Sequence, residues 1–315
     1  MITYDRYNWR SIVCSVRGSA VSRAKWRILL ITLIAIAVQC VYEAETTLFG
    51  IKSATIFGLE PVEHAVLGSL LGFLLVFRMN ASNIRYWEGR THWGQIINAS
   101  RNLTRVGVEH TDGRHGTELA DLVSAYGISL RRTLHGQFDS LEEGGFLPER
   151  VRLEMAHFGN PPTAVAAAIS EWIARQQREG RIDSQLVRHL EDQLAKLVDA
   201  QGGCEKIQKT PLPFVYVVMI KQLIVVYLIT LPIAVGNHCG WWSPVLAAIV
   251  AAGLFGIEEA SVEIEDPFGT DDNCLDMETY TLGIIRDTAQ LAARKVREAN
   301  LLASETESPA PSFGS

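Results

Sequence analysis

The chain has 315 residues, of which 48% are hydrophobic and 20% are charged, and its formal net charge is −6. A chain this acidic lacks the basic surface of nucleic-acid-binding proteins, so we expect no nucleic acid among its partners. The apolar residues are concentrated in four runs, which favours a membrane protein over a soluble one.

These four runs predict membrane-spanning helices, because a bilayer requires roughly 17–25 mostly apolar residues for each crossing. We place the spans at about residues 26–42, 61–85, 211–236 and 239–257. The first two runs are short, so a buried helix of a soluble domain is the alternative for each. The third run contains Lys221, and an ammonium is costly inside a bilayer. It predicts either a functional position or a lysine near the boundary that pairs with Glu258 or Glu259.

Positive charge around the runs predicts the orientation. Arginine and lysine cluster before the first run, after the second and before the third. The segment 43–63 holds one cation, Lys52, and four glutamates. By the positive-inside rule, both termini and the long middle segment face the cytosol.

The cytosolic part is predicted to be a helical bundle over about residues 86–210 and 258–302, so the fold is all-α. We expect the second span to continue as a helix through residues 93–110, followed by helices over 118–135, 164–178, 183–200 and 279–302. Gly202-Gly203 is expected to end the helix over residues 183–200. The apolar residues of segment 118–135 follow helical spacing: Leu119, Leu122, Val123, Tyr126 and Leu130. Residues 303–315 are predicted to form a disordered tail.

The sequence contains no enzyme motif, and its five cysteines are too scattered for a disulfide framework or a metal site. His110 and His115 flank Asp112, but that stretch contains glycines and is more typical of a surface loop than of a metal site. We therefore predict that the chain is not an enzyme and has no catalytic residue, metal or cofactor. A membrane enzyme that uses the two histidines is an alternative hypothesis.

Within the second span, Ser69, Phe73 and Phe77 recur every four residues. They lie along one stripe of a helix, about 6 Å apart along its axis. Gly68 and Gly72 fall on an adjacent face, where another helix could approach closely. On the pattern alone, the stripe is as compatible with lipid or packing contacts as with a function.

Three motifs add to this pattern. The second span leads into Phe77-Arg78-x-Asn80 and then Arg85-x-Trp87-Glu88-Gly89-Arg90-x-x-Trp93-Gly94. The third span opens with Leu212-Pro213-Phe214-Val215-Tyr216, and the fourth is followed by Asp266-Pro267-Phe268-Gly269-x-Asp271-Asp272. In this order and at these separations, the motifs resemble those of bacterial bestrophins, over roughly residues 9–295.

The resemblance implies a homopentameric ion channel whose second spans surround a central pore, with residues 1–302 as a single channel unit. Ser69, Phe73 and Phe77 match the positions of a narrow hydrophobic neck. Ser69 departs from the family, in which these positions are usually bulky and apolar. A second, cytosolic constriction falls at Gln185 or Leu186.

Eukaryotic bestrophins bind Ca²⁺ through a clasp that includes the acidic segment. Asp266 and Asp271 match clasp positions, but Cys274 replaces a later acidic ligand. Because Ca²⁺ prefers six to eight oxygen ligands, a thiol is a poor substitute. We interpret the two aspartates as vestigial clasp positions and predict no high-affinity activation by Ca²⁺.

The expected function is passive conduction of ions through the hydrophobic neck of a multi-pass protein in the bacterial inner membrane. The acidic segment and the bacterial form of the motifs favour monovalent cations such as Na⁺. A chloride channel of the same family is one alternative, because aromatic ring edges are weakly positive. A non-conducting signalling scaffold anchored in the membrane is the other. The expected partners are further copies of the chain, membrane lipids and permeant monovalent ions.

Overall fold

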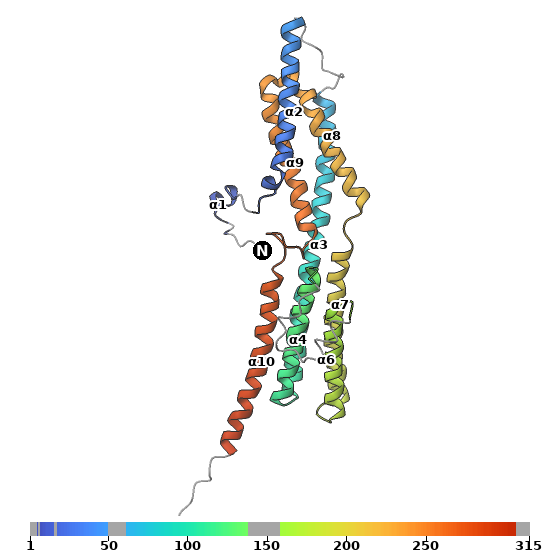
Figure 1. Cartoon of the computed structure of the whole chain (residues 1–315), viewed down its shortest axis with the longest axis vertical. Helices are drawn as coiled ribbons and strands as arrows, with labels where there is room; N and C mark the ends of the chain where they lie inside the picture. The colour runs from blue at the N-terminus through green and yellow to red at the C-terminus, as the bar shows by residue number, and fades with distance from the viewer. Residues whose placement is uncertain (1–4, 6, 16–17, 50–60, 138–157, 307–315) are drawn as a thin grey trace, which may run out of the picture. The chain divides into compact units, whose positions relative to one another are not determined.

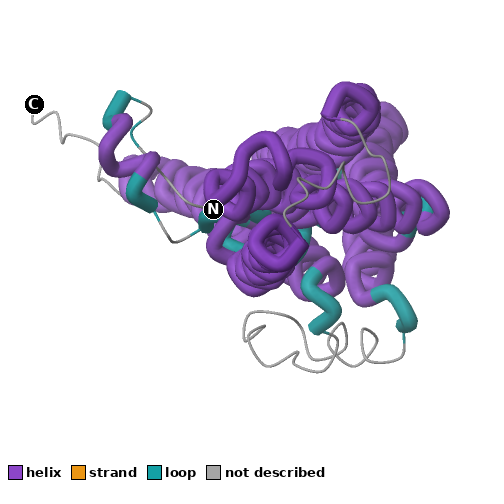
Figure 2. The backbone as a smooth tube through the Cα atoms, turned by 90° about the horizontal axis from the view of Figure 1, so that it is seen from above, coloured by secondary structure: helices purple, strands orange, loops and turns teal. Residues whose placement is uncertain are grey.

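The computed structural model describes residues 5, 7–15, 18–49, 61–137 and 158–306. Within these ranges every regular element is a helix (Figure 2), which confirms the all-α prediction. The chain divides into two compact units. The first comprises Met1–Trp87 and Thr210–Cys274, and the second comprises Glu88–Lys209 and Leu275–Ser315. The first unit extends to Cys274, beyond residue 257, where the last predicted span ends.

Four long helices build the first unit (Figure 1). These are α2 (Ala20–Phe49), the first part of α3 (Pro61–Glu109), α8 (Phe214–Cys239) and α9 (Ser243–Glu265). A short helix, α1 (Trp9–Val13), precedes them, and the 3-10 turn η2 (Gly240–Trp242) joins α8 to α9. All four contribute to one apolar core, which comprises Ala24, Ile31, Ala35, Leu71, Leu75, Ile220, Ile224, Leu228, Leu231, Ala247, Ala251 and Phe255. The alanines of α2 and α9 have no exposed surface there, so these two helices pack closely.

The outer surface of this unit is apolar as well. Leu30 and Leu33 of α2 and Ile249 of α9 are exposed large hydrophobic residues. A helix that is apolar on all sides is typical of a membrane span. By length and composition, three stretches of consecutive helical residues could cross a membrane: Ala20–Leu48, Pro61–Glu109 and Phe214–Glu265. The sequence predicted four spans, and the third stretch contains the last two of them.

The third stretch is a hairpin of two helices. Nζ of Lys221, in α8, lies 3.2 Å from Oε1 of Glu258, in α9. In one straight helix, residues this far apart in the chain would be separated by about 55 Å. The chain therefore reverses at η2, where Gly240 has a φ of +54°. Glycine adopts this left-handed conformation without the steric cost of a Cβ.

The second unit is a bundle of the remaining helices. It contains the rest of α3 together with α4 (Gly113–Leu134), α6 (Pro161–Arg178), α7 (Ser184–Lys209) and α10 (Met277–Thr306). The predicted apolar face of segment 118–135 is confirmed, because Leu119, Leu122, Val123, Tyr126 and Leu130 of α4 are all buried. The predicted continuation of the second span is also confirmed, since α3 is a single helix as far as Glu109.

The prediction that Gly202-Gly203 ends a helix was wrong. Helix α7 runs through both glycines to Lys209. A Cβ on Gly203 would lie 2.3 Å from ring atoms of His92, in α3. Glycine at this position therefore allows α7 to pack against the His92 ring.

One prediction about a chain end falls partly outside the described residues, and so does the connection between the first two long helices. Helix α10 continues to Thr306, so it includes the first residues of the predicted tail, while residues 307–315 lie outside the described residues. Between the first two spans, α2 ends at Phe49 and α3 begins at Pro61, and residues 50–60 also lie outside the described residues.

Candidate functional site

The exposed face of α3 in the first unit carries the three predicted neck positions. Phe73 and Phe77 are 61% and 50% exposed, and Ser69 is exposed as well. Leu71 and Leu75, on the opposite face of the helix, are each 1% exposed and belong to the core. The two aromatic rings thus point away from the apolar core of the first unit.

The side chains of Ser69, Phe73 and Phe77 make two contacts within α3 itself. The rings of Phe73 and Phe77 meet edge to face, with their centroids 4.6 Å apart. The Ser69 hydroxyl donates a hydrogen bond to the carbonyl of Ala65, one turn earlier, at 2.9 Å. Because that hydroxyl already has a partner, the stripe presents a small side chain at Ser69 and two bulky apolar ones beyond it.

The same face of α3 stays exposed beyond the phenylalanines as far as the end of the first unit, at Asn80, Ile84 and Trp87. We call the exposed residues Ser69, Phe73, Phe77, Asn80 and Ile84 the α3 stripe. A row of exposed apolar side chains on one helix is typical of a surface that another molecule covers or that lines a passage.

One of the two glycines beside the stripe permits a close helix contact, as predicted. A Cβ on Gly68 would lie 2.6 Å from the hydroxyl of Tyr227, in α8. The Tyr227 ring also stacks on buried His64, with centroids 4.3 Å apart and planes 11° apart. A Cβ on Gly72 would have no atom within 4 Å, so the small size of Gly72 is not explained by packing within the described residues.

Arg78 follows the stripe directly and is buried. Its Nη2 lies 3.6 Å from Oε1 of Glu258 and 3.5 Å from Oε2 of Glu265, both in α9. Within the described residues, Nε and Nη1 of Arg78 have no hydrogen-bond partner. A buried guanidinium is retained only when carboxylates compensate its charge, so this contact fixes Arg78 to α9.

Glu258 is the centre of this charged network. Besides Arg78, its carboxylate contacts Lys221 at 3.2 Å and Arg27 at 3.6 Å. The predicted pairing of Lys221 with Glu258 or Glu259 is therefore confirmed for Glu258. Arg27 also binds Glu259, so the network connects α2, α3, α8 and α9.

Glu265 brings the three sequence motifs together. Its side chain accepts the backbone N–H of Leu212 at 3.0 Å and contacts Arg78, and its carbonyl accepts Nε of Arg85 at 3.0 Å. Asp266 follows it immediately and begins the third motif. The motifs of α3, of the start of α8 and of the end of α9 thus form a single structural site, although they are far apart in the chain.

The two predicted clasp positions have partners from the protein itself. Oδ1 of Asp266 accepts the backbone N–H of Phe268 at 3.1 Å, which closes a turn. Oδ1 of Asp271 lies 3.0 Å from Nη1 of Arg23, whose Nη2 contacts Glu263 at 3.1 Å.

Cys274 closes the same turn. Its thiol donates to the carbonyl of Asp266 at 3.4 Å, and burial raises the pKa of that thiol to about 11. A thiol that stays protonated is a poor metal ligand. No group of three or more potential metal ligands occurs among the described residues.

In the second unit, Gln185 and Leu186 occupy the first turn of α7. The Asp183 carboxylate accepts their backbone N–H groups at 3.0 and 2.9 Å, as a helix cap does. The Gln185 side chain is exposed and that of Leu186 is half-buried.

Asp112 caps α4 in the same way. Its carboxylate accepts the backbone N–H of His115 at 3.0 Å and also contacts the His115 ring. These bonds hold the pKa of the Asp112 carboxyl below its usual range.

These features define an all-helical membrane protein with an apolar outer surface and a charged network at the base of one exposed helix face. The family model described as "Bacterial/Fungal Bestrophin protein" matches residues 1–289, and the chain belongs to this family.

Relatives and solved structures agree. A voltage-dependent anion channel-forming protein of Nostoc is 31% identical over 88% of this chain and 89% of its own. A voltage-dependent anion channel-forming protein of Escherichia coli is 30% identical over 92% of this chain and 94% of its own. The crystal structure of a bacterial bestrophin homolog from Klebsiella pneumoniae has the same fold. It superimposes with a TM-score of 0.78 at 23% identity, over 85% of this chain and 98% of that chain.

Sequence reasoning missed the role of Arg78 and Glu265. The sequence interpretation used Arg78 as a cation flanking the second span and as part of the first motif, and it grouped Glu265 with the other acids near the fourth span, without pairing the two residues. The available signal was that α3 continues without a break past Arg78, which keeps this cation within reach of the neighbouring helices.

Proposed function

We propose that the chain is the subunit of a homopentameric, passive ion channel, and that the α3 stripe of five copies lines its pore. The observation that carries this proposal is the exposure of Phe73 and Phe77 on the face opposite the buried Leu71 and Leu75. In a ring of subunits this face can turn toward the symmetry axis while the opposite face keeps its core contacts. Family membership supports the same assignment.

The proposed mechanism involves no chemical step. Five copies of Phe73 and Phe77 form a short apolar constriction, from which water withdraws readily when the rings approach one another. Ions then pass down their electrochemical gradient when the rings separate. Ser69, one turn before Phe73, makes the throat wider and more polar on that side. A second constriction in the cytosolic part is assigned to Gln185 or Leu186.

We assign anions as the favoured permeant ions, in place of the Na⁺ that the sequence favoured. That expectation depended on free carboxylates in the acidic segment. In the structure, five of these carboxylates contact a cation: Glu258, Glu259, Glu263, Glu265 and Asp271. Paired acids concentrate cations less than free acids do. The names of the relatives, voltage-dependent anion channel-forming proteins, and the positive edges of the phenylalanine rings support the same choice.

The proposed topology has four crossings, by α2, the first part of α3, α8 and α9, in the inner membrane. The excess of cations before α2 and after the stripe supports cytosolic termini. The reversal at η2 supports two separate crossings for α8 and α9. Trp241 and Trp242 are exposed at this turn, as is typical of tryptophan at a membrane interface.

Ion currents from the purified protein in planar lipid bilayers test the function. The wild type is expected to conduct, and Phe73→Ala and Phe77→Ala are each expected to raise the conductance or the open probability. Ile249→Ala, which removes an equally exposed apolar side chain from α9, serves as the control and is expected to leave the current unchanged. Absence of current would favour a scaffold, and unchanged currents in both phenylalanine variants would contradict the pore assignment.

Selectivity is tested with the reversal potential under a NaCl gradient. A reversal potential close to the chloride equilibrium potential is expected. A reversal potential close to the sodium equilibrium potential would overturn the anion assignment and leave the channel itself intact.

A further inference from the structure

Within the second unit, a cleft of about 720 Å³ lies between α3 and α10. Its walls carry four arginines, Arg101 and Arg105 from α3 and Arg294 and Arg297 from α10, and a single carboxylate, Asp287. Arg101 and Arg105 are four residues apart on one face of α3, and Arg294 and Arg297 are three residues apart on one face of α10. A basic cleft is unexpected in a chain whose net charge is −6.

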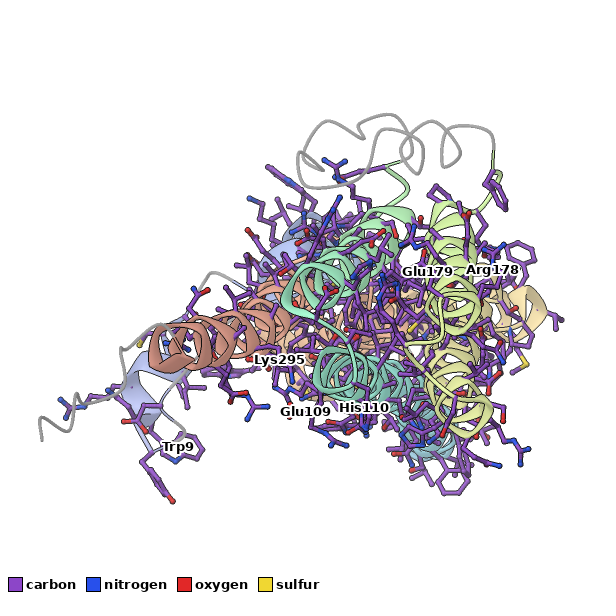
Figure 3. All side chains as sticks on the ribbon, turned by 90° about the horizontal axis from the view of Figure 1, so that it is seen from below. Trp9, Glu109, His110, Arg178, Glu179 and Lys295 are labelled. Carbon is purple, nitrogen blue, oxygen red and sulfur yellow. The ribbon has the colours of Figure 1, made fainter. Side chains whose placement is uncertain are left out.

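Two of the four arginines are already neutralised. Arg101 binds Asp287 through Nε and Nη2, at 2.7 and 2.6 Å. Arg294 contacts Glu109 at 2.5 Å and Glu298 at 3.5 Å. At the same end of the cleft, Lys295 donates to the carbonyl of Glu109 at 3.1 Å, and Figure 3 shows these two residues on neighbouring helices.

The other two arginines keep uncompensated charge. In the part of the chain that the structure describes, Arg105 has no ion pair or hydrogen bond, and Arg297 donates only from Nε, to the carbonyl of Ala293 at 3.3 Å. The ion pairs around the cleft do not cancel this charge. Counted together, the four arginines and the residues linked to them by ion pairs are six cations and three carboxylates. The cations are Arg101, Arg105, Arg286, Arg294, Lys295 and Arg297, and the carboxylates are Glu109, Asp287 and Glu298. The cleft lining alone carries the same excess of three positive charges, because four arginines face a single carboxylate, Asp287. A bound anion relieves the repulsion among such cations.

We propose that this cleft binds a small soluble anion that carries two or three phosphate groups. The planar guanidinium group matches the oxygens of a phosphate in pairs of parallel hydrogen bonds. Arg105 and Arg297 stand on different helices, so a ligand with more than one phosphate engages both at once. The cleft is within the size range of small-molecule sites, and it contains no aromatic side chain that would select a base.

A lipid headgroup is the other source of phosphate, and the position of Arg101 disfavours it. Along α3, Arg101 lies about 24 Å beyond Arg85, where the predicted span ends. The headgroup layer on each side of a bilayer is only about 5–8 Å thick. The site goes beyond the proposed channel function, because binding of an anion to it can be measured without any current.

The test is isothermal titration of the full-length protein in detergent micelles with tripolyphosphate, pyrophosphate and monophosphate. Tripolyphosphate is expected to bind at one site per chain, and monophosphate at least about tenfold more weakly, because it reaches one guanidinium instead of two. Arg105→Gln and Arg297→Gln are each expected to weaken binding about tenfold. Arg105→Lys, which keeps the charge and loses the planar fork, is expected to fall between wild type and Arg105→Gln.

Arg188→Gln is the matched control, because Arg188 is an exposed arginine of the same unit outside the cleft. It is expected to bind as the wild type does. No binding of tripolyphosphate to the wild type, or equal binding by wild type and the double variant Arg105→Gln/Arg297→Gln, would overturn the proposal. Binding to phosphatidylcholine vesicles that contain phosphatidic acid, lost in the double variant and unaffected by tripolyphosphate, would also overturn it, in favour of a lipid ligand.

Discussion

The guanidinium of Arg78 and the carboxylate of Glu258 lie 3.6 Å apart, and both side chains are almost completely enclosed, with 1% and 2% of their surface exposed. Arg78 immediately follows Phe77, so the contact determines which way this part of α3 is turned. If Arg78 faces α9, Phe77 cannot. The buried ion pair thereby holds the α3 stripe on the outside of the first unit.

Removing the carboxylate of Glu258 alone should lower the free energy of unfolding more than removing both Glu258 and Arg78. Glu258→Gln leaves Arg78, Lys221 and Arg27 without their shared carboxylate, and loss of one partner of a buried pair typically costs about 3–5 kcal/mol. The double variant Glu258→Gln/Arg78→Met should regain part of that loss in the free energy of unfolding, measured in detergent by tryptophan fluorescence. Strictly additive effects of the two substitutions would show that the residues are not coupled.

Lys221→Met should leave the single-channel current unchanged. The Lys221 ammonium is half-exposed. When this ammonium is removed, Glu258 still has Arg78 and Arg27 as partners. Such a pair contributes about 0–1 kcal/mol, so a small decrease in unfolding midpoint is the only expected effect. A large change in current, in bilayer recordings of the wild type and the variant side by side, would identify Lys221 as part of the ion pathway.

The buried thiols should resist alkylation at pH 8. Burial raises the pKa of Cys204 to about 12 and that of Cys274 to about 11, because a thiolate is poorly solvated there. At pH 8 about one Cys274 thiol in a thousand is then ionised. Peptide mass analysis after iodoacetamide treatment should find Cys14 modified, since it is exposed, and Cys204 and Cys274 intact. After denaturation all three should react, and equal native rates at Cys14 and Cys274 would contradict the buried position.

Calcium should bind weakly or not at all. One oxygen of Asp271 is held by Arg23, one oxygen of Asp266 is held by the backbone of its own turn, and Cys274 supplies a protonated thiol. Titration of the purified protein with CaCl₂ should give no site of micromolar or tighter affinity. The variant Cys274→Asp places a carboxylate at this position and is the comparison most favourable to Ca²⁺. Tight binding of Ca²⁺ by the wild type would contradict the vestigial interpretation.

Local patterns were enough to predict most of the helices, and one contact between distant charges was also predicted. The five apolar residues of α4 were predicted correctly because helical periodicity is a property of neighbouring residues. The Lys221 contact was anticipated because the hydrocarbon environment strongly limits what an ammonium can pair with. The orientation of Phe73 and Phe77 toward a pore stays a prediction, since it depends on other copies of the chain.

The errors have equally specific causes. Gly202-Gly203 was interpreted as a helix end because glycine lowers helix propensity, but packing of Gly203 against the ring of His92 outweighs a cost of about 1 kcal/mol. The basic cleft was missed because the arginines of α3 were used only as evidence of orientation. Their neighbours on α10 lie almost 190 residues later in the chain, and no local pattern connects the two helices.

The tight reversal at Gly240 has a consequence for how the protein is made. In the proposed topology only η2 separates the crossings made by α8 and α9, so the two helices insert as a pair, with Lys221 and Glu258 brought together as the second helix enters. A product truncated after α8 would leave both Arg78 and Lys221 without the carboxylate of Glu258. The hairpin of α8, η2 and α9 is therefore the smallest part of this region in which Lys221 has its carboxylate partner.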